Sequence, residues 1–296
     1  MGEGNPPDQD KVPETDWLGD GPDAAVLDRA VRILRPLLAV FDPCFVGLDR
    51  VPTTGGNVFV GNHTMIGMLD YAILYLELYR RLGVALWSLA DHFHYTVPLW
   101  RDLLLANGAF DGTRENCSSV LARGGNIVIF PGGAREVTRR SGEQNTLLWG
   151  ERTGFARVAM AADAPIVPVA FVGGDDWYRI VYDTNRILGT RVGDAIDTRF
   201  RRRGMHVDGY MPSIIRGIGP TLLPRPERLY YWFGEPIEPA EFGDDPDDEV
   251  ALAKLRDAAR DALSAGISEL LALRQRDPRR NPSSFVRNLL GRTHRG

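Results

Sequence analysis

A histidine and an aspartate stand seven positions apart, just after an apolar run, "NVFVG" (57–61), that is typical of a strand. His63 at a strand end could act as a general base, with the Asp70 carboxylate holding its ring in one tautomer. It could equally be an ordinary histidine satisfied by local hydrogen bonds. On a regular helix, seven positions span about 10 Å, which is too far for a hydrogen bond. A working pair therefore requires a looped segment around Gly67, which glycine permits.

A glycine-rich loop, "FPGGARE" (130–136), directly follows a second apolar run. The amide groups of Gly132 and Gly133 could face an anion or a developing oxyanion, and Arg135 could bind a phosphate or a carboxylate. The alternative is a tight turn between a strand and a helix. The sequence has no G-x-S-x-G elbow, P-loop, Rossmann G-x-G-x-x-G or HExxH zinc helix. A histidine base beside an oxyanion cradle, without an enzymic nucleophile, suits direct attack of a substrate hydroxyl on a thioester.

Short apolar runs alternate with helical patterns along the chain. The strands and helices that this alternation predicts must position the two motifs. Strands are predicted at 57–61, 85–90, 126–130 and 165–173, and helices at 69–82 and near 115–123. The pattern favours a single α/β domain with a largely parallel central sheet flanked by helices. Residues 228–237 predict a later strand at the sheet edge, and residues 247–276 predict a long amphipathic helix.

The two ends of the chain differ from its middle. Residues 1–22 are acidic, with Pro and Gly, and predict a disordered leader. Residues 23–44 predict an amphipathic helix that would either pack on the domain or dip into lipid head groups. The folded domain would span 45–276. The basic tail, 277–296, carries apolar residues among its arginines, a pattern that favours contact with anionic lipid.

The composition argues against several classes of protein. A net charge of −4 at pH 7 is unlike that of a general nucleic-acid binder. The two cysteines form no CxxC motif, and His92 and His94 have no third ligand pattern, so no metal is expected. The sequence shows no signal peptide and no apolar stretch of about 18 residues. We therefore expect a cytoplasmic protein that is soluble or peripheral on the cytoplasmic face of a membrane.

Four blocks in order resemble the glycerolipid (PlsC-type) acyltransferase superfamily. They are "NHTMIGMLD" (62–70), "GAFDGTRENCSSVL" (108–121), "FPGGARE" (130–136) and "APIVPVAFVG" (164–173). Within that superfamily, "LADHFHYTVP" (89–98), "FPGGAREV" and "LLWGERTGFARVA" (147–159) look most like the diacylglycerol-acyltransferase-like branch, which includes proteins that acylate neutral glycerides. The similarity covers roughly residues 45 to 240.

The resemblance implies a role for individual residues. His63 would be the catalytic base and Asp70 the residue that orients it. Gly132, Gly133, Arg135 and Glu136 would border the substrate, with Arg114 as a further candidate for a phosphate contact. Asp91 and His92 also match the branch, and they could contact the catalytic residues rather than the substrate.

Two departures from the family pattern bear on the substrate. The usual block has four residues between His and Asp, whereas six stand between His63 and Asp70. The usual third block is "FPEGTR", and Gly132 stands where its acidic residue would be. The second departure favours a neutral alcohol over glycerol-3-phosphate or lysophosphatidate.

The expected activity is therefore transfer of a fatty acyl group from acyl-CoA or an acyl carrier protein to a lipid hydroxyl at an anionic membrane surface. The resemblance implies no cofactor beyond the acyl donor and no nucleic-acid partner. Three alternatives stay open: a phosphatidate-forming lysophospholipid acyltransferase, an acyl-thioester hydrolase and a non-catalytic lipid-binding protein.

Overall fold

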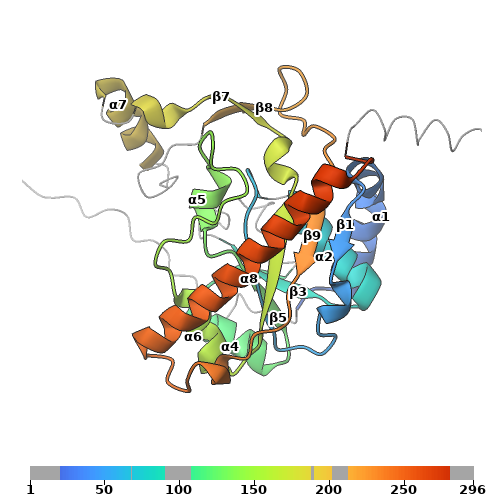
Figure 1. Ribbon diagram of the computed structural model, residues 1–296, viewed down its shortest axis with the longest axis vertical. Coiled ribbons are helices and arrows are strands. Elements are labelled where there is room, and N and C mark those ends of the chain that lie inside the picture. The colour runs from blue at the N-terminus through green and yellow to red at the C-terminus, as the bar shows by residue number, and fades with distance from the viewer. Residues whose placement is uncertain (1–20, 68, 91–107, 188–189, 202–212, 281–296) are drawn as a thin grey trace, which may run out of the picture.

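The apolar runs pair side by side into one seven-stranded sheet in the computed structural model, which describes residues 21–67, 69–90, 108–187, 190–201 and 213–280 (Figure 1). The strands, in their order across the sheet, are β1 (Cys44–Val46), β9 (Tyr230–Phe233), β6 (Ile166–Val172), β2 (Val58–Gly61), β5 (Asn126–Ile129), β3 (Leu86–Ala90) and β4 (Ala109–Asp111). Five neighbouring pairs are parallel, and only β6 and β9 pair antiparallel. The predicted α/β fold with a largely parallel sheet is confirmed.

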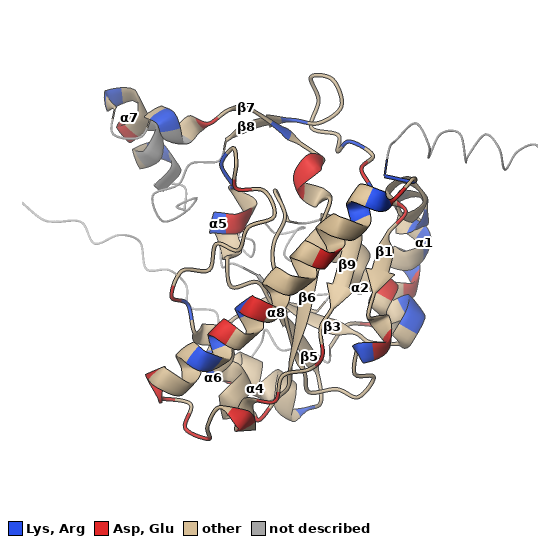
Figure 2. Cartoon of the chain, in the orientation of Figure 1, with Lys and Arg blue, Asp and Glu red and all other residues tan. Residues whose placement is uncertain are grey.

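Helices cover both faces of this sheet, as the apolar character of its strands requires. One face packs against α4 (Arg114–Ala122), α6 (Gly154–Ala161) and α8 (Glu249–Arg276). The other packs against α1 (Ala24–Phe41) and α2 (Leu69–Leu82). Side chains alternate accordingly along β2, where Val58 and Val60 join the first cluster and Phe59 the second. The central strands are drawn almost free of charged residues (Figure 2).

The N-terminal helix α1 packs on the domain. The Asp23 carboxylate caps it by accepting from the N–H groups of Ala25 and Val26. Leu27 and Phe41 are buried against the α2 side of the sheet, whereas Ile33 is 67% exposed. Packing on the domain is therefore the alternative that the structure shows for this helix.

The prediction that residues 228–237 form an edge strand is wrong. Strand β9 lies second from the edge, because the short strand β1 pairs along its outer side, with Phe45 opposite Tyr231. The sequence of β1 has only three residues, too few for a recognisable strand pattern.

A second, two-stranded sheet projects beyond the central sheet, at the top of Figure 1. It pairs β7 (Arg179–Tyr182) antiparallel with β8 (Ile214–Arg216), and α7 (Arg191–Arg201) lies between them in sequence. Short helical segments complete the structure: η1 (Leu48–Arg50), α5 (Gly133–Val137), η3 (Gly174–Asp176), η4 (Thr184–Ile187) and η5 (Pro239–Glu241).

Among the described residues, no helix combines the length and the apolar composition that a bilayer span requires. The predictions of a disordered leader and of a basic tail fall almost wholly on residues 1–20 and 281–296, which lie outside the described residues.

Candidate active site

The two sequence motifs meet at one edge of the sheet. Strands β2 and β5 are parallel neighbours, so the loops that follow them leave the same edge. His63 stands two residues after β2, and Phe130 follows β5. Their rings stack with centroids 3.8 Å apart. The fold therefore brings the His63 loop and the "FPGGARE" loop into direct contact.

Four buried ionisable side chains hold the main chain of the loop after β2. Glu136 accepts from the N–H of His63 at 2.7 Å, and Arg139 donates to the carbonyl oxygen of His63 at 2.6 Å. Asp70 accepts from the N–H of Thr64 at 3.3 Å, and Asp175 accepts from the N–H of Met65 at 2.7 Å. We call Glu136, Arg139, Asp70 and Asp175 the anchor cluster. Its members come from different elements and fix three consecutive residues, which positions the His63 side chain.

The structure shows no direct hydrogen bond between Asp70 and His63. The Asp70 carboxylate accepts from the hydroxyl of Thr64 at 2.8 Å and from the N–H of Tyr71 at 2.7 Å. The Nδ1 atom of His63 is buried without a hydrogen-bond partner among the described residues. The chain is looped at Gly67, as a working pair requires, with a φ of +56°. Asp70 nevertheless binds the neighbouring residue, so it acts on the loop rather than on the ring.

Gly67 lies directly against the imidazole. A Cβ atom at this position would come within 2.5 Å of Nδ1 of His63, and the positive φ would strain any other residue. Nδ1 is therefore covered, while His63 as a residue stays partly exposed. This cover leaves Nε2 as the ring nitrogen that a substrate would have to contact.

Burial and charge set the protonation of the site. Desolvation, together with the nearby Arg139 cation, lowers the pKa of His63 to about 3, so the imidazole is neutral at pH 7. Desolvation raises the pKa of Glu136 to about 7, against the opposing effect of Arg139. Desolvation also raises the pKa of Asp70 and of Asp175. The cluster holds three carboxyl groups against one guanidinium group, and burial disfavours ionising all three.

Glu136 was expected to border the substrate, and its side chain is instead fully buried beneath the loop. Besides His63, it accepts from the N–H of Leu148 at 3.0 Å. Its side chain lies across Gly132, where a Cβ atom would fall 2.1 Å from the Glu136 carboxyl carbon. Gly132 therefore leaves room for Glu136 to reach His63.

The structure places the other predicted residues as follows. Arg135 pairs with Glu143. Gly133 has a φ of +48° and begins α5. Arg114 is exposed at the start of α4, on the same edge of the sheet but beyond β3 and β4. Asp91 and His92 lie outside the described residues, so their predicted supporting role stays a prediction.

Sequence reasoning missed three residues that shape the site: Thr64, Arg139 and Asp175. Arg139 donates to the carbonyl oxygens of Glu143 and Thr146 as well as to that of His63, and it is 1% exposed. No motif spacing marks Arg139 or Asp175. The one signal available was the presence of charged residues next to apolar runs.

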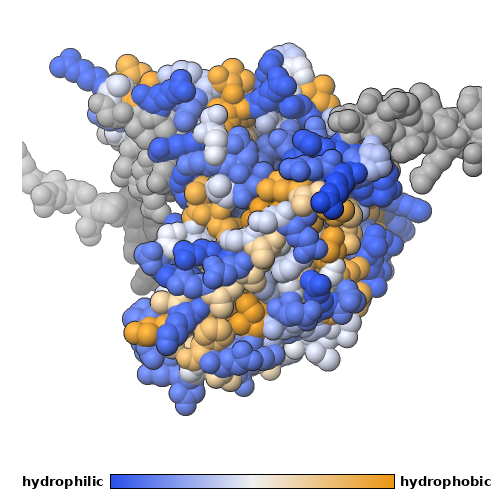
Figure 3. Space-filling model, in the orientation of Figure 1, coloured by the Kyte–Doolittle hydropathy of each residue, from blue (hydrophilic) through white to orange (hydrophobic). Residues whose placement is uncertain are grey.

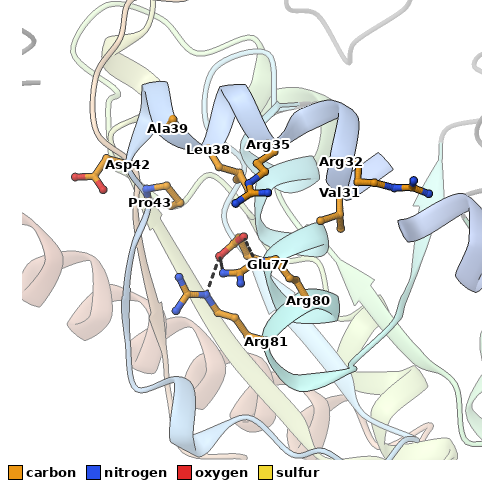
Figure 4. Close-up of a pocket in the computed structure, with 10 residues that line it drawn as sticks. All are labelled: Val31, Arg32, Arg35, Leu38, Ala39, Asp42, Pro43, Glu77, Arg80 and Arg81. Carbon is orange, nitrogen blue, oxygen red and sulfur yellow. Dashed lines mark hydrogen bonds and ion pairs between the residues drawn. The ribbon is translucent and has the colours of Figure 1, made fainter. Parts of the chain in front are cut away.

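A surface cleft of about 600 Å³ lies elsewhere, between α1 and α2 (Figure 4). Glu77, on α2, binds Arg80 and Arg81 there. None of the predicted site residues lines this cleft. Among the described residues, no group of three or more His, Cys, Asp or Glu is placed to hold a metal ion.

Comparisons with known proteins agree with the fold and the blocks. Residues 42–172 match the family model described as "Acyltransferase". "Phytyl ester synthase 2, chloroplastic" from Arabidopsis thaliana is 28% identical over 254 residues, which cover 79% of this chain and 35% of that protein. "DGAT1/2-independent enzyme synthesizing storage lipids" from Homo sapiens is 31% identical over 149 residues, which cover 47% of this chain and 45% of that protein.

One solved structure shares the fold. The 1-acyl-sn-glycerophosphate (LPA) acyltransferase PlsC from Thermotoga maritima superposes with a TM-score of 0.53 at 15% identity, covering 83% of this chain and 80% of that one. At this identity the match supports the fold alone.

Together these matches confirm the resemblance predicted from the four blocks, and the match to the acyltransferase family model is confined to residues 42–172. The match to the plant relative spans only 35% of its length. Its activity belongs to a longer protein.

Proposed function

We propose that this protein is an O-acyltransferase that moves a fatty acyl group from an acyl thioester to the hydroxyl of a neutral lipid, with His63 as general base. The donor is acyl-CoA or an acyl carrier protein, and the acceptor is a glyceride or a long-chain alcohol. The protein works at the cytoplasmic face of an anionic membrane. The observation that carries the proposal is the neutral His63 ring, held at the sheet edge by the anchor cluster.

The chemistry follows from this placement. Nε2 of His63 accepts the proton of the acceptor hydroxyl while the oxygen attacks the thioester carbonyl carbon. A C–O bond forms, the C–S bond breaks, and the thiolate leaves and takes up the proton from the imidazolium. The low pKa of His63 keeps the imidazole neutral at pH 7, so Nε2 has a lone pair free to accept this proton. Catalytic hydrogen bonds often tighten only in the substrate complex.

A neutral acceptor agrees with the charges around the ring. A phosphate group carries close to two negative charges and is usually met by several cations. Arg135 is paired with Glu143, and Arg139 is buried against the main chain. The aromatic ring of Phe130 stacks on the His63 ring. The names of the relatives, which refer to synthesis of phytyl esters and of storage lipids, support the same class of acceptor.

The test is a competition assay with one labelled acyl-CoA and equimolar acceptors, read by product mass. We expect monoacylglycerol, diacylglycerol or a long-chain alcohol to be acylated faster than lysophosphatidate or glycerol-3-phosphate. Preference for the phosphorylated acceptors would restore the phosphatidate-forming alternative. Free fatty acid with every acceptor would instead indicate a hydrolase.

His63→Ala tests the base directly. It should lower turnover by about 10²- to 10⁴-fold while the protein stays folded, because Glu136 and Arg139 bind the main chain of His63 rather than its ring. Full turnover in a well-folded His63→Ala protein would remove this residue from the mechanism.

A non-catalytic lipid-binding protein is the second candidate. The observation that favours it is that Asp70 binds Thr64 and makes no hydrogen bond to His63. Lipid binding by the wild type without acyl transfer to any of the acceptors above would select this candidate.

A further inference from the structure

The two-stranded sheet exposes apolar side chains that the central sheet would bury. We call β7, β8 and the loop 217–223 the extension. It holds six of the large hydrophobic residues with marked exposure: Val181 (58%), Tyr182 (42%), Ile214 (56%), Ile218 (50%), Leu222 (67%) and Leu223 (63%). Hydrophobic residues are visible at this end of the molecule, among hydrophilic ones (Figure 3). Exposed apolar residues gathered on one small element are candidates for an interaction site.

The loop 217–223 presents its apolar side chains in a defined shape. The N–H of Gly217 donates to the carbonyl oxygen of Thr221 at 2.7 Å, and that of Ile218 donates to Leu223 at 2.8 Å. The loop therefore satisfies part of its own main chain. Leu222 and Leu223 can then enter an apolar medium without leaving those groups unpaired.

The same sheet carries a pair of arginines in an unfavourable position. Arg179 stands directly opposite Arg216 across the two strands, and both are exposed. Among the described residues, no acidic side chain forms an ion pair with either one. Like charges directly opposite each other destabilise a strand pair. An anionic partner would relieve this repulsion.

Two of the apolar residues and both arginines lie on one face. Ile214 and Arg216 are two positions apart on β8, so they point to the same side of the sheet. Tyr182 is paired with Ile214, and Arg179 with Arg216. This face thus combines the apolar residues that enter a lipid interface with the cations that bind anionic head groups.

The extension starts beside the candidate site. It leaves the central sheet through η3, in which Asp175 binds the main chain of Met65. Arg179 follows Asp175 by four positions, a chain length of about 14 Å at most. A membrane on this face would therefore lie close to His63.

We propose that the extension is the surface that docks this protein on an anionic lipid bilayer, with Leu222 and Leu223 inserted and Arg179 and Arg216 bound to lipid head groups. The proposal rests on the proposed function, since a docking surface would bring the enzyme to its lipid acceptor. Its physical test is independent of that function.

The experiment is sedimentation of the full chain with vesicles of phosphatidylcholine alone and with added phosphatidylglycerol. Wild type should bind the anionic vesicles more strongly, and added salt should weaken the binding. Leu222→Ser/Leu223→Ser should lower the partition coefficient by at least about tenfold, because each leucine loses the gain from burial. Arg179→Gln/Arg216→Gln should remove the preference for anionic vesicles.

Matched controls separate this surface from others. Val250→Ser/Leu273→Ser removes two exposed apolar residues of α8, and Ile33→Ser removes one from α1. Both controls should bind like wild type. The proposal is overturned if wild type does not bind either vesicle, if the Leu222/Leu223 variant binds unchanged, or if a control loses as much binding as that variant.

A second readout distinguishes this proposal from the proposed function. Transfer from a short-chain acyl thioester to a short-chain, water-soluble alcohol should be the same in the Leu222/Leu223 variant and in wild type. Loss of this soluble reaction together with vesicle binding would overturn the proposal, since the variant would then have altered more than docking. Vesicle binding through the extension by a protein without acyl transfer would support the docking surface and reject the enzyme.

Discussion

The central sheet and the extension use the same kinds of residue in opposite ways. Val58, Phe59 and Val60 in β2 are 0% exposed, whereas Ile214 in β8 is 56% exposed. The difference lies in what covers them, because helices pack on both faces of the large sheet. Arginines follow the same contrast, since Arg139 is buried and bonded to main-chain oxygens while Arg179 and Arg216 face each other in the open. An apolar or cationic side chain stabilises the fold only where the tertiary structure gives it a partner.

The largest effect is expected from Arg139→Met. Removing this guanidinium leaves Glu136 and Asp175 buried without their cation and unpairs the carbonyl oxygen of His63. Breaking a buried pair in this way should lower the free energy of unfolding by about 3–5 kcal/mol, measured by chemical denaturation. Arg216→Met is the control in the extension and should cost nothing or stabilise slightly. Equal losses of free energy of unfolding in the two variants would contradict the contrast between the central sheet and the extension.

The contribution of Glu136 to the free energy of unfolding is expected to depend on pH. Its folded pKa of about 7 lies above the ordinary value of 4.5, so the folded state holds a proton more tightly than the unfolded state. The stability from this group is therefore full below about pH 4.5 and is lost as the pH rises through about 7, by up to about 3 kcal/mol. His63, with its pKa lowered to about 3, acts in the opposite direction between about pH 3 and 6.5.

The difference in free energy of unfolding between Glu136→Gln and wild type isolates the contribution of Glu136, because His63 is present in both proteins. The variant should be relatively more stable at pH 8 than at pH 5, as measured by denaturant unfolding at both values. A difference that does not change with pH would show that Glu136 titrates in the ordinary range.

Gly132→Ala should have a smaller cost, about 1–3 kcal/mol, because its Cβ atom would meet the Glu136 side chain at 2.1–2.2 Å. The displaced carboxyl group would lose its bond to the N–H of His63. In a Glu136→Ala background the same substitution should cost much less, which a double-mutant cycle measures. Additive costs would mean that the two residues do not share this space.

The smallest effect is expected in the extension. Leu222→Ser should change the free energy of unfolding by no more than about 0.5 kcal/mol, because the side chain is already 67% exposed. Thermal and chemical unfolding both measure this. A loss of several kcal/mol would mean that the loop packs in solution and would contradict its role as a free surface.

Much of the fold could be predicted from local patterns. The apolar runs at 126–130 and 165–173 contain β5 and β6, and the helix predicted at 69–82 is α2 (Leu69–Leu82). Such strands can be recognised in the sequence, because strands buried on both faces of a parallel sheet need apolar residues at nearly every position. The strand at the sheet edge could not be predicted, because β1 is too short to show an alternating pattern. Its pairing with β9, which is distant in sequence, is determined only by the tertiary structure.

The candidate site divides in the same way. The types and order of His63, Gly132 and Glu136 could be read from the sequence, because each follows shortly after an apolar strand. Their roles depended on tertiary contacts. Six residues between His63 and Asp70 did not reveal that the carboxylate would bind Thr64, and no spacing placed Arg139 or Asp175 beneath the same loop. Hydrogen bonds between residues distant in sequence depend on how the strands are ordered in the sheet. That order follows from the burial of whole faces rather than from any one segment.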